Sequence, residues 1–192
     1  MRELLKLLRR LLQGELRKTR RRKLSAPVLL AVLTIAIFGI NRLLEEPTAP
    51  LPPKGAELAC KISNVYDGDT VAASCEKGKL TVRIFGIDAP ELGQKPWGKR
   101  SRDLLRNLMP RSVRLEVTDK DRYGRVVARL YQGNQDVGLE LVRQGGAVVY
   151  THYNKLRTYR LAQGEAKREK LGVWSRPGAH QEPWEWRKLN PR

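Results

Sequence analysis

Residues 58–87 read LACKISNVYDGDTVAASCEKGKLTVRIFGI. Asp67 and Gly68 stand between two runs rich in apolar and β-branched residues, and an Asp-Gly pair in that setting is a strong signal for a β-hairpin. A second set of turn residues, EKGK, separates these runs from LTVRIFGI. We therefore expect three consecutive strands, at residues 58–66, 69–75 and 80–87.

Downstream of this stretch, helical and extended patterns alternate. Residues 98–109 have the spacing of an amphipathic helix, and Pro110 ends it. Two further strands and two further helices follow, the first of these helices closing on glycine. The whole is a mainly β, α+β fold: a five-stranded closed barrel of the oligonucleotide/oligosaccharide-binding (OB) type with three helices. The later elements are expected at residues 112–118, 125–131, 137–146 and 157–171.

The chain has 192 residues, a formal charge of +18 and a pI near 10.4. Such a field favours polyanionic partners, either nucleic acid or an anionic membrane surface. The two cysteines and two histidines lack the spacing of a zinc site. Cys60 and Cys75 flank the predicted hairpin, so they could form a disulfide outside the cytoplasm, although the sequence does not give their separation.

The N-terminal part of the chain has a different composition. Residues 1–24 contain ten Lys or Arg and two Glu, with leucines at helical spacing; they predict a basic amphipathic segment on a membrane surface, or a solvated tail. Residues 25–44 include APVLLAVLTIAIFGI, which predicts one transmembrane signal anchor with the N-terminus in the cytoplasm and the domain outside. The alternative is a signal peptide whose cleavage releases a secreted domain. A Pro-rich linker at 45–56, the domain at 57–188 and a tail at 189–192 complete the expected organisation.

Charged residues near the strand ends have a common chemical logic. Asp69 and Asp88 are hard oxygen ligands suited to Ca²⁺, with water and a backbone carbonyl completing the shell. Glu91 is a carboxylate that can act as a base on water. Arg83 and Arg125 can hold a phosphate with their forked guanidinium groups. A metal, a base and two arginines suit the hydrolysis of a phosphodiester.

Arg83 and Asp88 are five residues apart, so on a regular strand they would face opposite sides. Both are expected at one site. Glycine within a strand often marks a bulge, and Gly86 lies between them. We therefore predict a bulge or kink near Gly86 that brings both side chains to a common face.

Six stretches of the domain form a pattern that is specific as a set. They are VYDGDTV, VRIFGIDAPE, DRYGR, LVRQGGA, AKREKLGVW and PWEWR, in this order across residues 58–188. With these stretches the domain resembles the staphylococcal nuclease (thermonuclease-like) family. The resemblance implies the barrel fold, dependence on Ca²⁺, and hydrolysis of DNA and RNA to products that carry a 3′-phosphate. Nothing in the sequence indicates an obligate protein partner.

The resemblance also implies roles for individual residues. Asp69 and Asp88 match calcium carboxylates, and Ala89 stands at a position that ligates through its backbone carbonyl. Arg83 and Arg125 match phosphate-binding arginines, and Glu91 matches the proposed general base. The supporting positions are Asp67 and Thr70.

The aromatic positions match the family less well. Tyr153 aligns with a tyrosine that stacks on the nucleotide, whereas the partner position falls one residue from Tyr150. Base stacking by Tyr150 or Tyr153 is thus a weaker expectation, and Trp97 and Trp174 are expected to serve packing.

Two other functions remain open at this point. The first is a non-catalytic OB-fold module that binds nucleic acid and is tethered to a membrane. The second is a scaffold that uses the basic N-terminal segment at a membrane surface. A non-catalytic binding module would not need all five charged residues of the predicted site together. A membrane-surface scaffold would explain none of them. The five residues are Asp69, Arg83, Asp88, Glu91 and Arg125.

Overall fold

The computed structural model of the chain describes residues 30–37, 39 and 51–191. The chain divides into two compact units, Met1–Glu46 and Pro47–Arg192. In the first unit, residues 30–37 are helical. The second unit contains all the residues of the predicted site.

The predicted N-terminal organisation falls largely outside the described residues. This holds for the basic segment at 1–24, for most of the predicted anchor at 25–44 and for the first part of the linker at 45–56. Within the part of the chain that the structure describes, no helix has both the length and the apolar character needed to cross a membrane.

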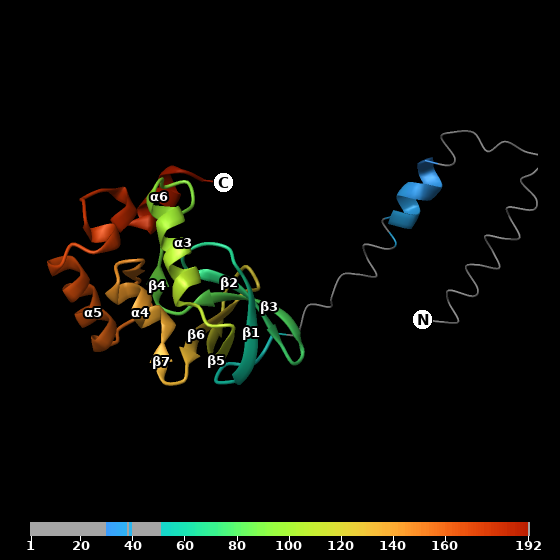
Figure 1. The fold of residues 1–192 in the computed structure, drawn as a ribbon, viewed down its shortest axis with the longest axis horizontal. Helices are drawn as coiled ribbons and strands as arrows, with labels where there is room; N and C mark the ends of the chain where they lie inside the picture. The colour runs from blue at the N-terminus through green and yellow to red at the C-terminus, as the bar shows by residue number, and fades with distance from the viewer. Residues whose placement is uncertain (1–29, 38, 40–50, 192) are drawn as a thin grey trace, which may run out of the picture. The chain divides into compact units, whose positions relative to one another are not determined.

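Five strands of the second unit form a closed barrel: β1 (Glu57–Val65), β2 (Thr70–Cys75), β3 (Gly78–Ile84), β5 (Ser112–Lys120) and β6 (Val126–Gln132). The sheet runs in the order β3-β2-β1-β5-β6, with antiparallel neighbours (Figure 1). A parallel pairing of β3 with β6, from Val82↔Val126 to Ile84↔Ala128, joins its two ends. The predicted five-stranded α+β barrel of the OB type is confirmed.

The barrel interior is filled by alternate residues of these strands. In β5, Val113, Leu115 and Val117 are buried, whereas the residues between them are partly exposed. In β2, Val71 and Ala73 are fully buried. Successive strand residues point to opposite faces, so the alternating pattern of the sequence determines which side chains enter the core.

Three helices match the prediction to within a few residues, namely α3 (Trp97–Leu108), α4 (Val137–Arg143) and α5 (Arg157–Arg168). The Asp136 carboxylate caps α4 by accepting a hydrogen bond from the Leu139 N–H at 3.1 Å. Gly145, at φ +70°, ends that helix in a conformation that favours glycine. Short 3₁₀ turns occupy Gly172–Trp174 and Ala179–Gln181.

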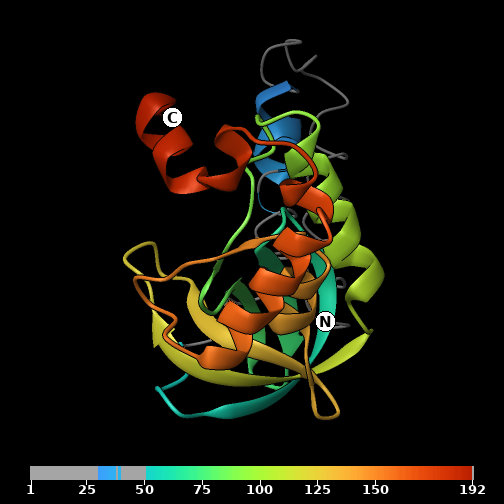
Figure 2. The same cartoon turned by 90° about the vertical axis from the view of Figure 1, so that its left-hand side faces the viewer.

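One helix was not predicted: α6 (Pro183–Leu189), at the C-terminal end of the unit. In Figures 1 and 2 it lies at the top of the unit, while the barrel strands lie toward the bottom. It begins at Pro183, a residue suited to the first turn of a helix.

The predicted kink between Arg83 and Asp88 is present. β3 ends at Ile84, Gly86 has φ +68°, and a short strand β4 (Ile87–Asp88) follows. β4 leaves the barrel sheet and pairs with β8 (Val148–Val149). β7 (Gln135–Asp136) pairs antiparallel with the last residues of β6. The change of direction at Gly86 brings Asp88 back toward Arg83.

Cys60 and Cys75 lie opposite each other on β1 and β2, with their Cα atoms 4.3 Å apart, and form a disulfide. The bond closes a loop with a sequence separation of 15 residues. A loop of that size restricts the unfolded chain enough to contribute about 3 kcal/mol to stability.

Candidate active site

The loop between β1 and β2 holds Asp69 in place. The Asp67 carboxylate accepts a hydrogen bond from the Asp69 N–H at 3.0 Å, and the Tyr66 N–H donates to the Thr70 carbonyl at 2.9 Å. The predicted hairpin is present, because β1 and β2 pair antiparallel on either side of Asp67 and Gly68. Gly68 does not adopt a positive φ, so the turn does not depend on that freedom of glycine. A Cβ at Gly68 would lie 1.9 Å from Ser101 Oγ of α3. Glycine is required there by the close approach of a helix.

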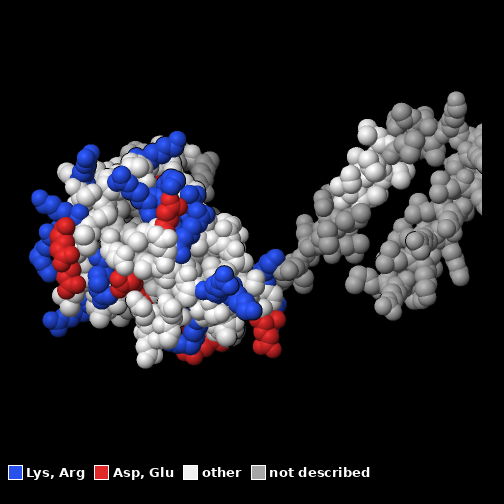
Figure 3. Space-filling model, in the orientation of Figure 1, with Lys and Arg blue, Asp and Glu red and all other residues white. Residues whose placement is uncertain are grey.

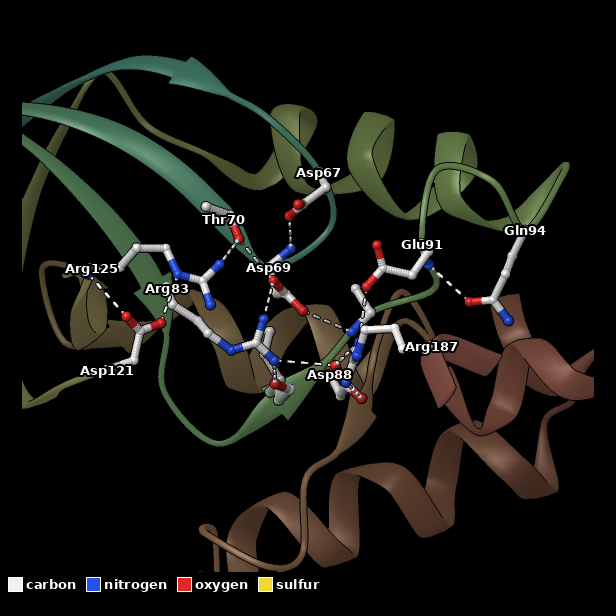
Figure 4. A network of polar contacts seen from close by, with 12 residues as sticks. Asp67, Asp69, Thr70, Arg83, Asp88, Glu91, Gln94, Asp121, Arg125 and Arg187 are labelled. Carbon is white, nitrogen blue, oxygen red and sulfur yellow. Dashed lines mark hydrogen bonds and ion pairs between the residues drawn. The ribbon is translucent and has the colours of Figure 1, made fainter. Parts of the chain in front are cut away.

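Asp69 is a buried carboxylate with three hydrogen-bond donors around it (Figure 4). Its Oδ1 accepts from Arg83 Nη1 at 2.6 Å and from Thr70 Oγ at 2.9 Å. Its Oδ2 accepts from the Ala89 N–H at 3.0 Å. Thr70 and Ala89 therefore both orient Asp69, and the contact of Ala89 is made by its N–H.

Arg83 bridges the two predicted metal-binding carboxylates. While Nη1 donates to Asp69, Nη2 donates to Asp88 Oδ1 at 3.1 Å and to the Ile87 carbonyl at 3.3 Å. Burial opposes the charge on Arg83, but Asp69 and Asp88 outweigh that effect and raise its pKa. Asp88 is fully buried, and this burial raises its pKa, while a hydrogen bond from Arg187 acts in the opposite direction.

Arg187, on α6, is a site residue that the sequence reasoning missed. Its Nη1 donates to Asp88 Oδ1 at 3.0 Å and to Glu91 Oε1 at 2.9 Å, and its Nη2 donates to Asp88 Oδ2 at 2.9 Å. Burial opposes its charge, but hydrogen bonding and attraction to Asp88 raise the pKa of Arg187. The only signal for it was the conspicuous stretch PWEWR, of which it is the last residue.

Glu91 lies on the loop between β4 and α3. Its N–H donates to Gln94 Oε1 at 2.9 Å, and the Gln94 side chain donates in turn to the Ala179 carbonyl at 3.0 Å. Gln94 is itself buried. The C-terminal segment thus holds the loop that carries Glu91, through Gln94 as well as through Arg187.

Arg125 approaches from the turn between β5 and β6. Its backbone N–H and its Nε both donate to Asp121, at 2.9 and 2.7 Å. Partial burial opposes the charge of Asp121, but these bonds to Arg125 lower its pKa. Arg125 Nη1 lies 3.4 Å from Thr70 Oγ, so Thr70 contacts both Asp69 and Arg125. The predicted residues from three separate motifs are therefore brought to one site.

Comparison with known proteins supplies the family. A family model described as "Staphylococcal nuclease homologue" matches residues 81–176. A protein of Shigella flexneri called micrococcal nuclease is 36% identical over 151 residues, which is 72% of this chain and 85% of that protein. The chain belongs to the staphylococcal nuclease family. The resemblance found in the sequence is thereby confirmed.

Other proteins that the chain resembles are also described as nucleases. A Haemophilus influenzae protein called an uncharacterized endonuclease is 36% identical over 131 residues, or 67% of this chain and 72% of that protein. A probable staphylococcal-like nuclease of Oryza sativa subsp. japonica is 33% identical over 133 residues, covering 69% of this chain but 33% of that protein.

Asp67 is a second carboxylate of the loop between β1 and β2, next to Asp69. Burial, reinforced by the negative charge of Asp69, raises its pKa to about 6. Its side chain accepts from the Asp69 N–H. The supporting role that the resemblance implies for Asp67 stays a prediction.

Tyr150 and Tyr153 lie directly after β8 in an aromatic cluster. Their ring centroids are 5.1 Å apart in an edge-to-face arrangement, and Tyr153 is exposed. The Trp184 ring of α6 lies parallel to Tyr150, with 6.2 Å between centroids. Trp97 stacks on the buried His180 at 4.0 Å, in agreement with its expected packing role.

The oxygen atoms of Asp69 and Asp88 are of the type that Ca²⁺ prefers as ligands. Asp69 and Asp88 provide two buried carboxylates next to the backbone of Ala89, and hard cations prefer such ligands together with water. Among the residues that the structure describes, no three Asp, Glu, His or Cys side chains are grouped so that they could hold a metal ion. Both carboxylates are instead bonded to arginines.

Proposed function

We propose that this chain is a Ca²⁺-dependent nuclease that hydrolyses phosphodiester bonds of DNA and RNA and leaves products with a 3′-phosphate. The observation that carries the proposal is the bridge of Arg83 between the buried Asp69 and Asp88, in a chain whose family relatives are called nucleases. The domain also bears many Lys and Arg side chains on the face drawn in Figure 3, as a polyanion-binding protein requires.

Each site residue has a role in this proposal. Asp69, Asp88 and the Ala89 carbonyl would hold Ca²⁺, which when bound supplies positive charge next to the scissile phosphate. Arg83 and Arg125 each provide a forked cation for the phosphate and for the charge that develops on it. Glu91 accepts the proton of the attacking water.

The experiment that tests the function uses the full chain with single-stranded DNA and RNA, in Ca²⁺, in Mg²⁺ and in EDTA. We expect cleavage with Ca²⁺ and none with EDTA, and products whose ends become extendable only after a phosphatase removes the 3′-phosphate. Tight binding without cleavage in every metal would contradict the proposal and support the non-catalytic OB-fold module.

Replacing Glu91 by Gln is expected to lower kcat about 100-fold, the lower end of what a general base contributes. Gln keeps an oxygen that can accept from Arg187, so the fold should change little. Glu185→Gln is the matched control, because Glu185 lies on α6 and pairs with exposed Lys188. If Glu91→Gln retains nearly full kcat, Glu91 does not act as the base.

The cellular location is also part of the proposal. Residues 25–44 would anchor the chain, with the N-terminus in the cytoplasm and the nuclease domain outside; release after signal cleavage is the alternative. We expect the full-length mass in the membrane fraction, and alkylation of Cys60 and Cys75 only after reduction. A shortened soluble form would support cleavage, whereas free thiols in protein isolated under non-reducing conditions would contradict the extracytoplasmic placement.

A further inference from the structure

The C-terminal helix α6 delivers a cation to the two carboxylates nearest the proposed chemistry. Arg187 engages both oxygens of Asp88 and one oxygen of Glu91 (Figure 4). A guanidinium group that donates two N–H bonds to one carboxylate forms strong hydrogen bonds with a fixed orientation. The geometry is that of a counter-ion located among the acidic groups of the site.

Other contacts keep this helix in place. The Trp186 ring packs so closely on the loop that a Cβ at Gly93 would lie 2.9 Å from it. Trp184, three residues before Arg187 and hence on the same side of the helix, lies parallel to Tyr150. The contacts of Trp184 and Trp186 therefore fix the helix that carries Arg187.

A divalent cation at Asp88 would meet the positive charge of Arg187 at short range. Asp88 already accepts one hydrogen bond from Arg83 and two from Arg187. A carboxylate offers about four lone-pair positions, so little capacity is left. Like charges a few ångströms apart in a buried site repel strongly, and Arg83 is held by Asp69 as well. Arg187 is thus the cation whose departure leaves the rest of the site intact.

We propose that Arg187 is a built-in counter-cation that a divalent metal must displace from Asp88 and Glu91, and that it thereby sets the metal affinity of the site. The inference rests on the proposed function, in which Asp69 and Asp88 are metal ligands. It adds that the C-terminal helix competes with the metal.

Calorimetric titration of the full chain with CaCl₂ tests this inference. Arg187→Gln should bind Ca²⁺ about tenfold more tightly than the wild type, because the positive charge bonded to the buried Asp88 is removed. Lys188→Gln is the matched control: it loses the same charge from the next residue of α6, but Lys188 is exposed and pairs with Glu185. Its Ca²⁺ affinity should equal that of the wild type.

The outcomes separate the inference from the function on which it rests. If Ca²⁺ binding is abolished by Asp69→Asn but is unchanged or weakened in Arg187→Gln, the metal site stands and the inference is overturned. If neither the wild type nor Arg187→Gln binds Ca²⁺, the proposed metal site fails and the inference fails with it.

A second measurement needs no variant. In two-dimensional NMR spectra, the guanidinium Nε–H signal of Arg187 should shift over the Ca²⁺ range of the calorimetric titration. The signal of Arg143, an exposed arginine that pairs with Glu140, should not. If Ca²⁺ binds and the Arg187 signal does not move, the metal does not displace Arg187 and the inference is wrong.

Discussion

Replacing Arg83 by Gln should reduce phosphodiester cleavage by about 1,000-fold. Removing one preorganised donor from a transition state costs about 100- to 1,000-fold, and a guanidinium on a transferring phosphoryl group contributes at least as much. Arg83 also holds Asp69 and Asp88 in one arrangement, so its removal disturbs the proposed metal ligands as well.

The same substitution should lower the free energy of unfolding. Without Arg83, the buried Asp69 and Asp88 lose a shared partner, and removal of one member of a buried ion pair costs about 3 kcal/mol or more. Arg83→Lys keeps the charge but not the fork, so it should recover most of the stability and little of the activity. Thermal melts measured beside the kinetics separate the two effects.

Arg143→Gln is the control for Arg83→Gln, since Arg143 is an exposed arginine of α4 that pairs with Glu140. It should leave both kcat/KM and the melting temperature close to those of the wild type. Retention of more than about a tenth of the wild-type activity in folded Arg83→Gln would mean that Arg83 does not act on the phosphate.

Replacing Gly86 by Ala should cost about 3 kcal/mol of stability. A non-glycine residue at φ +68° costs roughly 1–2 kcal/mol. The new Cβ would also lie 2.5 Å from Asn154 Nδ2 and 2.6 Å from Asn154 Cβ. Asn154 is buried and its side chain bonds Gly86 and Leu156, so it has little room to move, and such overpacking costs about 1–3 kcal/mol more.

Gly133→Ala separates the two costs, because Gly133 has φ +58° but nothing within 4 Å of its added Cβ. We expect it to lose about 1 kcal/mol, which is the backbone cost alone. Urea denaturation measures both values. Equal losses in the two variants would show that contact with Asn154 contributes nothing. Folded Gly86→Ala should also be less active, because the kink brings Asp88 to Arg83.

Much of the barrel could be predicted because each of its strands is indicated by residues that are close together in the sequence. Runs of apolar and β-branched residues bounded by turn residues indicated the five barrel strands. The spacing of five residues between Arg83 and Asp88 indicated the kink at Gly86. The close approach of α3 to Gly68 had no local signal, because α3 is distant in the sequence. The parallel pairing of β3 with β6 likewise has no local signal.

Arg187 could not be placed from the sequence for a related reason. α6 has seven residues, too few for a periodic pattern to identify a helix or its buried face. Arg187 also reaches Asp88 across 99 positions of the chain. Short elements that return to a distant site are positioned by tertiary packing, and propensity carries little information about that.

The parallel pairing of β3 with β6 also has a consequence for folding. The first hairpin can form from neighbouring residues, but β3 finds its second partner only when Ala128 is available. Non-local pairings of this kind slow folding. Until closure, the outer edges of β3 and β6 expose unpaired backbone groups, which favour association with other chains. A chain ending between β3 and β6 should therefore aggregate, and refolding of the full chain should become less efficient as protein concentration rises.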